Sequence, residues 1–180
     1  QYHGRDGEVI TEFNNLFKNE LQYWLNPVIK DFIYDYLAIK NSHKHFGIIL
    51  LHDYSFLITP AFKALEGTLI QIGEKLGFDT SKYNFKIGIV FSDENLEKFY
   101  NDVLKKIDDL DEEHKTDIQI WLNDARRILR HFRHSPAHFL GERKENWDEA
   151  FSFGDHILRI INEMCYSLVK SKIFEKIKKE

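Results

Sequence analysis

The sequence predicts an all-α protein, a bundle of five or six helices. Only three prolines and nine glycines occur among 180 residues, which leaves little turn material for many short strands. Apolar residues recur at spacings of three and four along most of the chain, as they do on the buried face of a helix. The length suits a single domain, residues 1–180. Because the chain begins with Gln1 rather than methionine, we expect this domain to be excised or processed from a longer chain.

Two helices are predicted in the first quarter of the chain. Helical spacing of apolar residues indicates the first over residues 8–24, and Asn26 and Pro27 end it. The same spacing indicates the second helix over residues 28–39. Residues 41–43 are polar and are predicted to form a loop.

A longer apolar stripe follows this loop. Helical spacing resumes at Phe46, and from Ile58 to Leu76 the apolar positions recur at intervals of four and three. Pro60 lacks the N–H group of a helix interior, so it starts a new helix or kinks a long one. Gly77 is well placed to cap the end of this helix.

The second half of the chain predicts three more helices. Residues 83–91 have the strongest strand character, so a short extended segment or hairpin is allowed there. Ser92 and Asp93 resemble a helix N-cap, and a helix is expected to follow through residues 96–107. The strongest apolar stripe indicates a helix over residues 116–134, and a last long helix is predicted over residues 147–173.

Charge is distributed unevenly, although its sum is only −4. Acids dominate residues 93–117, whereas residues 125–138 contain no acid, three histidines and four arginines, namely Arg126, Arg127, Arg130 and Arg133. Such a basic patch on an acidic protein is typical of a local phosphate site. Pairing of these arginines with the acidic segment explains the pattern equally well.

Nothing in the sequence indicates secretion or a membrane. The single cysteine, Cys165, forms no intramolecular disulfide and agrees with a reducing cytoplasm. The first residues lack the apolar core of a signal peptide. The longest nearly apolar stretch, residues 46–58, contains His52 and Asp53 and is too short to span a bilayer. We expect a cytoplasmic protein.

The end of the helix at residues 116–134 carries the strongest candidate for chemistry. Pro136 disfavours helical geometry at Ser135, so the helix is expected to end there and His138 to lie just beyond the break. A tight loop after the helix would return His138 to the side of Arg133. Arginine presents a charged planar fork that matches phosphate oxygens. Histidine titrates near neutral pH and can take a proton from a ribose 2′-OH or give one to a leaving 5′-oxygen. That route needs no metal and produces a 2′,3′-cyclic phosphate.

These residues resemble the signature of a known superfamily. Arg133, His134 and His138 are similar to the Arg-x4–6-His motif of the HEPN superfamily, whose members are α-helical and mostly metal-independent RNases of toxin–antitoxin, phage-defence and CRISPR systems. The resemblance implies that Arg133 and His138 are the catalytic pair and His134 their polar neighbour. Within this superfamily, Pro60-Ala61-Phe62-Lys63-Ala64-Leu65-Glu66-Gly67 resembles a helix of RnlA-type toxins (RNase LS). It implies that Glu66 is a supporting carboxylate. Spacing places Glu66 at the edge of a buried stripe and, taken alone, favours an exposed helix residue.

Other pairings of arginine and histidine are present. Arg126 and His131 have four residues between them, and Arg127 and His134 have six. Both pairs lie inside the predicted helix, so we prefer Arg133 and His138, which lie on either side of the break. Arg126 and Arg130 are then candidates for contacts with the RNA backbone, which position RNA without reading its sequence.

No metal or cofactor is predicted. His43 and His45 have no cysteine or clustered carboxylate at ligand spacing beside them, and no glycine-rich phosphate loop occurs. Trp24, Trp121 and Trp147 are expected in the core or at an interface.

The leading hypothesis is therefore a HEPN-type endoribonuclease, an RnlA-like toxin domain. The resemblance implies a homodimer, an RNA substrate and a protein antitoxin. The alternative from another class is a non-catalytic helical module that binds a partner protein. A HEPN protein that transfers nucleotides is disfavoured, because such proteins usually have a tyrosine soon after the histidine and here Phe139, Leu140 and Gly141 follow His138.

Overall fold

Helices account for all regular structure in the part of the chain that the computed structural model describes. It describes residues 7–46, 55–79, 93–134 and 147–177, and at residues 19, 44–46, 55–56, 93, 131–134 and 176–177 the helical backbone alone. Eight α-helices and one turn of 3-10 helix lie in these ranges, which confirms the all-α prediction. In chain order they are α1 (Gly7–Leu16), α2 (Asn19–Trp24), α3 (Pro27–Phe46), the 3-10 turn η1 (Ser55–Ile58), α4 (Thr59–Lys75), α5 (Asp93–Lys106), α6 (Glu112–His134), α7 (Trp147–Lys170) and α8 (Ile173–Ile177).

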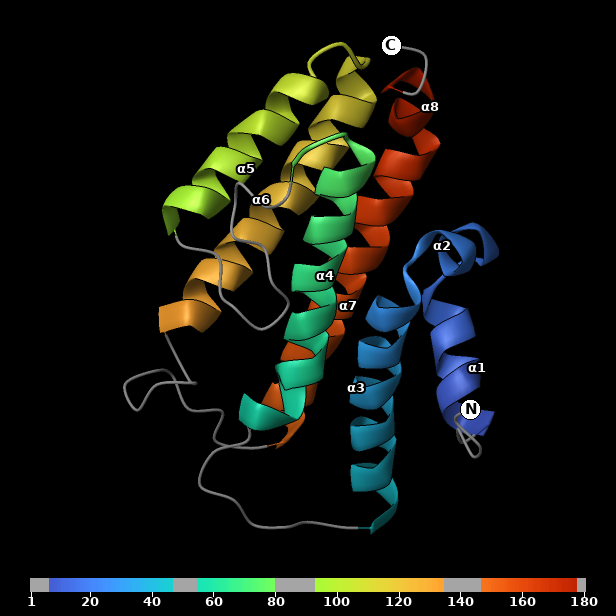
Figure 1. Cartoon of the computed structure of the whole chain (residues 1–180). Helices are drawn as coiled ribbons and strands as arrows, with labels where there is room; N and C mark the ends of the chain where they lie inside the picture. The colour runs from blue at the N-terminus through green and yellow to red at the C-terminus, as the bar shows by residue number, and fades with distance from the viewer. Residues whose placement is uncertain (1–6, 47–54, 80–92, 135–146, 178–180) are drawn as a thin grey trace.

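The bundle is organised around α4 and α7. Figure 1 shows these two helices at the centre, with α3 and α1 on one side and α6 and α5 on the other. The start of α4, the end of α6 and the start of α7 all lie in the lower half of this view. Buried side chains form one hydrophobic cluster to which all eight α-helices contribute. The helices that carry Glu66 and Arg133, α4 and α6, therefore share one core.

Two predictions for the first helices are corrected. The helix expected over residues 8–24 is interrupted between α1 and α2, where the side chain of Gln22 donates a hydrogen bond to the carbonyl of Phe17 at 2.6 Å. The loop predicted at residues 41–43 is wrong, because α3 continues through these residues to Phe46. The ring of His43 packs 5.0 Å from that of Trp147, a contact that favours the helix over the weak local preference of polar residues.

The predicted boundaries of α4 are confirmed. Pro60 lies in the first turn, so it starts a helix rather than kinking one. Gly77 has a φ angle of 78°, and the N–H groups of Gly77 and Phe78 donate to the carbonyls of Glu74 and Gly73. This arrangement is the Schellman cap, which glycine adopts without steric cost. The extended segment at residues 83–91 and the N-cap at Ser92 lie outside the described residues.

The remaining helices also have identifiable ends. Asp111 caps the start of α6, because its carboxylate accepts a hydrogen bond from the backbone N–H of His114 at 3.1 Å. This backbone hydrogen bond, with that of the His114 ring, lowers the pKa of Asp111. The helix expected over residues 147–173 ends as α7 at Lys170, and Lys172, with a φ angle of 54°, separates it from α8.

The positions of the three tryptophans agree with the expectation that they lie in the core or at an interface. Trp24, Trp121 and Trp147 are partly buried and pack against the hydrophobic cluster. Among the helices described, none is both long enough and apolar enough to cross a bilayer.

Candidate active site

Arg133 and His134 occupy the last turn of α6. The helix reaches this point because Ile118, Leu122 and Ala125 are buried on one face and hold it against the core. Its backbone is helical through His134, the residue before Ser135. Ser135, Pro136 and His138 lie outside the described residues, as do the side chains of Arg133 and His134. The convergence of Arg133 and His138 on one phosphate stays a prediction.

The alternative pairs can be judged from the backbone of α6. Arg126 and His131 are five positions apart, which places them about 140° apart around a helix with 3.6 residues per turn. Arg127 and His134 are on the same side, but seven positions separate them by about 10.5 Å along the axis. Helix geometry alone therefore brings neither pair to one phosphate.

Glu66 is a buried carboxylate on the most buried helix of the bundle. Eleven of the seventeen residues of α4 are buried, and Glu66 is 8% exposed. The reading of Glu66 as an exposed helix residue is thus wrong. One turn earlier, Phe62 packs against Phe153 of α7, with ring centres 5.9 Å apart. Because a buried carboxylate is costly unless it is paired or hydrogen-bonded, Glu66 has the environment of a functional or structural anchor.

Gln71, a buried polar side chain of α4, ties this helix to another part of the bundle. The amide of Gln71 donates to the carbonyl of Trp24 at 2.7 Å and accepts from the N–H of Asn26 at 2.8 Å. The hydroxyl of Thr68 donates to the carbonyl of Ala64 in the same helix at 2.7 Å. The turn between α2 and α3 is therefore tied to α4, which sets the position of Glu66 relative to the rest of the bundle.

Arg126 and Arg130 are paired within the protein. Both are on α6, and both contact the carboxylate of Glu97 on α5, at 2.8 Å for Arg126 and 3.2 Å for Arg130. The guanidinium of Arg126 also lies over the ring of Tyr100, 4.4 Å from its centre. Of the two explanations for the charge pattern, pairing with the acidic segment is observed for these arginines. Contact of the same residues with RNA stays a prediction.

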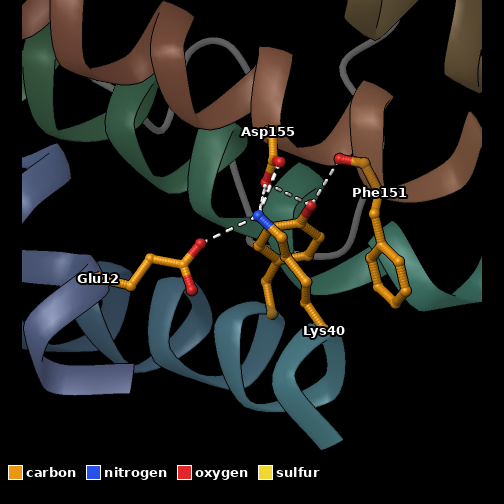
Figure 2. A network of polar contacts seen from close by, with 5 residues as sticks. Glu12, Lys40, Phe151 and Asp155 are labelled. Carbon is orange, nitrogen blue, oxygen red and sulfur yellow. Dashed lines mark hydrogen bonds and ion pairs between the residues drawn. The ribbon is translucent and has the colours of Figure 1, made fainter. Parts of the chain in front are cut away.

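A polar network that the sequence did not predict joins α1, α3 and α7 (Figure 2). The ammonium of Lys40 donates to Glu12 at 3.0 Å and to both oxygens of Asp155 at 2.7 Å. The hydroxyl of Tyr36 lies 2.9 Å from Asp155 and donates to the carbonyl of Phe151 at 2.8 Å. Tyr36 and Asp155 are 119 positions apart in the chain, and no local sequence motif predicts a contact between residues so far apart.

The network shifts the pKa values of two of its members. Burial, and after it the charge of Asp155, raises the pKa of Tyr36 above its ordinary value. Burial alone would lower the pKa of Lys40, but hydrogen bonds to Asp155 and Glu12 outweigh it and raise the pKa. Tyr36 is thus held as a neutral donor and Lys40 as a cation. We interpret the network as structural, because it fastens α3 to its neighbours.

A shallow depression of about 530 Å³ lies along the first turns of α7. Its lining consists of Asp148, Glu149, Ser152, Phe153 and His156. Phe153 connects the depression to α4 through its contact with Phe62. Within the described ranges, no group of three or more His, Cys, Asp or Glu side chains is arranged to hold a metal ion.

His43, one of the two histidines considered for a metal, has an aromatic environment. Its ring packs against Trp147 and Phe151, at 5.0 and 5.6 Å between ring centres, and its buried Nε2 atom has no hydrogen-bond partner. The side chain of His45 lies outside the described residues. His43 is therefore a packed side chain at the end of α3.

Comparison with protein-family models, with curated proteins and with solved structures finds no match for this chain.

Proposed function

We propose that this chain is a metal-independent endoribonuclease of the HEPN type, with Arg133 and His138 as the catalytic pair. The observation that carries the proposal is the burial of Glu66 in α4, because the resemblance to RnlA-type toxins assigns a supporting carboxylate to that position. A carboxylate that is only 8% exposed is an expensive feature for a helix to keep without a role. The helical backbone of α6 through His134 agrees with it, since Arg133 belongs to this helix as expected.

The proposed reaction is a transfer within the RNA backbone. His138 takes the proton of a ribose 2′-OH, and the 2′-oxygen forms a bond to phosphorus while the bond to the 5′-oxygen breaks. The leaving 5′-oxygen receives a proton, which gives a 2′,3′-cyclic phosphate and a 5′-OH. Arg133 stabilises the charge that develops on the phosphate oxygens. In this scheme Glu66 orients one member of the pair, and His134 is their polar neighbour.

The biological setting follows from the same resemblance. We propose a cytoplasmic toxin of a type II toxin–antitoxin or phage-defence system, active as a homodimer and restrained by a protein antitoxin. The acidic segment at residues 108–113, which leads from α5 into the first turn of α6, is a candidate docking surface for that antitoxin.

Cleavage of RNA in EDTA tests the catalytic assignment. The wild-type chain, Arg133→Ala and His138→Ala are incubated with a labelled RNA, and product ends are analysed for 2′,3′-cyclic phosphate. General acid–base help is worth about 10²- to 10⁴-fold, so His138→Ala should slow cleavage by about that factor. Glu66→Gln, which keeps the shape of the side chain, should slow it less. Thermal unfolding of each variant separates lost catalysis from lost folding.

The outcomes divide the hypotheses. Cleavage that survives both Arg133→Ala and His138→Ala would contradict the catalytic pair, and cleavage abolished by EDTA would contradict the metal-independent route. An inactive wild-type chain would favour the second candidate, a non-catalytic module that binds a partner protein.

A further inference from the structure

Glu97 holds the two arginines that the sequence predicts for contact with the RNA backbone. Its carboxylate extends from α5 to α6, where one oxygen lies 2.8 Å from Arg126 and the other 3.2 Å from Arg130. All three side chains are within reach of solvent, since Arg126, Arg130 and Glu97 are 24%, 45% and 33% exposed. A solute can therefore approach the cluster.

Arg126 is fixed by contacts that do not involve Glu97. Its guanidinium lies over the ring of Tyr100 on α5, and its second terminal nitrogen donates to the side chain of Asn123 at 3.0 Å. Only the first terminal nitrogen is turned toward Glu97, at 2.8 and 3.1 Å from the two carboxylate oxygens. Loss of the Glu97 carboxylate would therefore leave Arg126 in place with a donor directed at the same point.

The cluster has more positive than negative charge. Two guanidinium groups, those of Arg126 and Arg130, contact the one carboxylate of Glu97. Guanidinium binds carboxylates and phosphates by the same pattern of parallel N–H donors, so the two anions compete for one position. Glu97 is partly exposed and screened by solvent, which makes it an anion that another can displace.

We propose that Arg126 and Arg130 form a binding site for one backbone phosphate of single-stranded RNA, which Glu97 occupies in the free protein and which the phosphate takes by displacing it. This inference rests on the proposed ribonuclease function and deepens it. Glu97 then sets the strength of RNA binding without touching the reacting atoms, and its removal strengthens binding.

The test is the affinity for RNA of Glu97→Gln, which keeps the side-chain shape and removes the charge. Binding of a labelled single-stranded oligoribonucleotide is measured in EDTA as a function of salt, in a His138→Ala background so that RNA is not cleaved. Affinity for single strands falls with salt by an exponent of about 0.7 per phosphate contacted, which is about 5-fold between 0.1 and 1 M salt. In the parent, the displaced carboxylate of Glu97 takes up a cation, which offsets the counterion that this phosphate releases. Glu97→Gln should bind about 5-fold more tightly at 0.1 M salt, with a slope steeper by about 0.7.

Two controls separate this site from a general effect of charge. Glu94→Gln removes an exposed carboxylate one turn earlier on α5 and should change the affinity less. Adding Arg130→Gln to Glu97→Gln should return the affinity and the salt slope toward those of the parent. Glu97→Asp, a milder change that keeps the charge and shortens the side chain, should strengthen binding by a smaller factor.

RNA binding by the parent with unchanged affinity and slope in both Glu97 variants would overturn this inference and leave the proposed function standing. Absence of RNA binding by all variants, together with no cleavage by the wild-type chain, would overturn both.

Discussion

Gly154 has no room for a side chain, because Tyr36 packs directly on its backbone. A Cβ atom built at Gly154 would overlap the ring and hydroxyl of Tyr36. The ring has little freedom to move, since its hydroxyl is held by the carbonyl of Phe151 at 2.8 Å and by Asp155 at 2.9 Å. The close approach of α3 and α7 thus depends on residue 154 being glycine, which has a hydrogen atom where alanine has a methyl group.

Gly154→Ala should therefore be strongly destabilising. Overpacking of a core costs about 1–3 kcal/mol or more, and here the clash is with a ring held at both ends, so we expect about 3 kcal/mol in urea unfolding. Gly7→Ala is the matched control, because a Cβ at Gly7 meets nothing within 4 Å. Adding Tyr36→Leu should recover part of the loss if the clash is its cause. Equal stability of Gly154→Ala and the wild-type chain would contradict this account of the contact.

At the scale of residues, the sequence predicted the place of a residue within its helix better than the residues that it contacts on other helices. The cap at Gly77 follows from local chemistry, and the structure confirms it. Spacing alone favoured an exposed Glu66, because it does not say how far the neighbouring helices cover the edge of a buried stripe. The pairing of Arg126 with Glu97 was one of two explanations, since charge along the chain does not fix which residues meet across two helices.

At the scale of helices, the position of α4 depends on Gln71. This side chain is 6% exposed and forms both of its hydrogen bonds with backbone groups of the turn between α2 and α3. A buried amide in that position replaces the water that the carbonyl of Trp24 and the N–H of Asn26 would otherwise bind. It ties the helix that carries Glu66 to the N-terminal part of the bundle.

Gln71→Met should lower the free energy of unfolding by about 2–4 kcal/mol, because each backbone group left without a partner costs about 1–3 kcal/mol. Urea unfolding followed by circular dichroism measures the change. Gln119→Met, at a half-exposed position of α6, is the control and should change stability by less than about 0.5 kcal/mol. A loss of similar size at both positions would show that the two hydrogen bonds of Gln71 contribute little.

The interruptions of the helices were the least predictable features of the fold. Apolar spacing continues through residues 16–19, so it gives no sign that α1 and α2 are separate helices. The end of α3 was placed too early for the opposite reason, because polar residues suggested a loop where His43 packs against Trp147. The longer α3 arises from a contact between residues distant in the chain, which overrides a weak local preference. The break between α1 and α2 is accompanied by a local hydrogen bond, from Gln22 to the carbonyl of Phe17, which apolar spacing does not reveal.

At the scale of the whole molecule, the burial of two titratable side chains makes the free energy of unfolding depend on pH in the alkaline range. Burial raises the pKa of the Cys165 thiol above the ordinary value of 9.0, and burial followed by the charge of Asp155 raises the pKa of Tyr36 above 10.0. Above these ordinary values the unfolded chain loses the protons that the folded chain keeps. Ionisation then stabilises the unfolded state, so these two groups leave stability unchanged below about pH 9 and lower it above that pH.

The expected slope is about 1.4 kcal/mol per pH unit for each such group, so the free energy of unfolding should begin to fall near pH 9 and fall about twice as steeply once Tyr36 contributes. Lys40 acts in the same direction. Because its pKa is raised, its ion pairs persist to pH values above 10.5 and are lost when the pH exceeds the raised pKa.

Urea unfolding between about pH 8 and 11 measures the profile. Cys165→Ala should lower stability at neutral pH and abolish the decline between about pH 9 and 10, whereas Tyr36→Phe should leave that decline and reduce the one above it. Parallel profiles for both variants and the wild-type chain would show that other groups govern the alkaline transition, because the difference between profiles isolates the one proton that each variant removes.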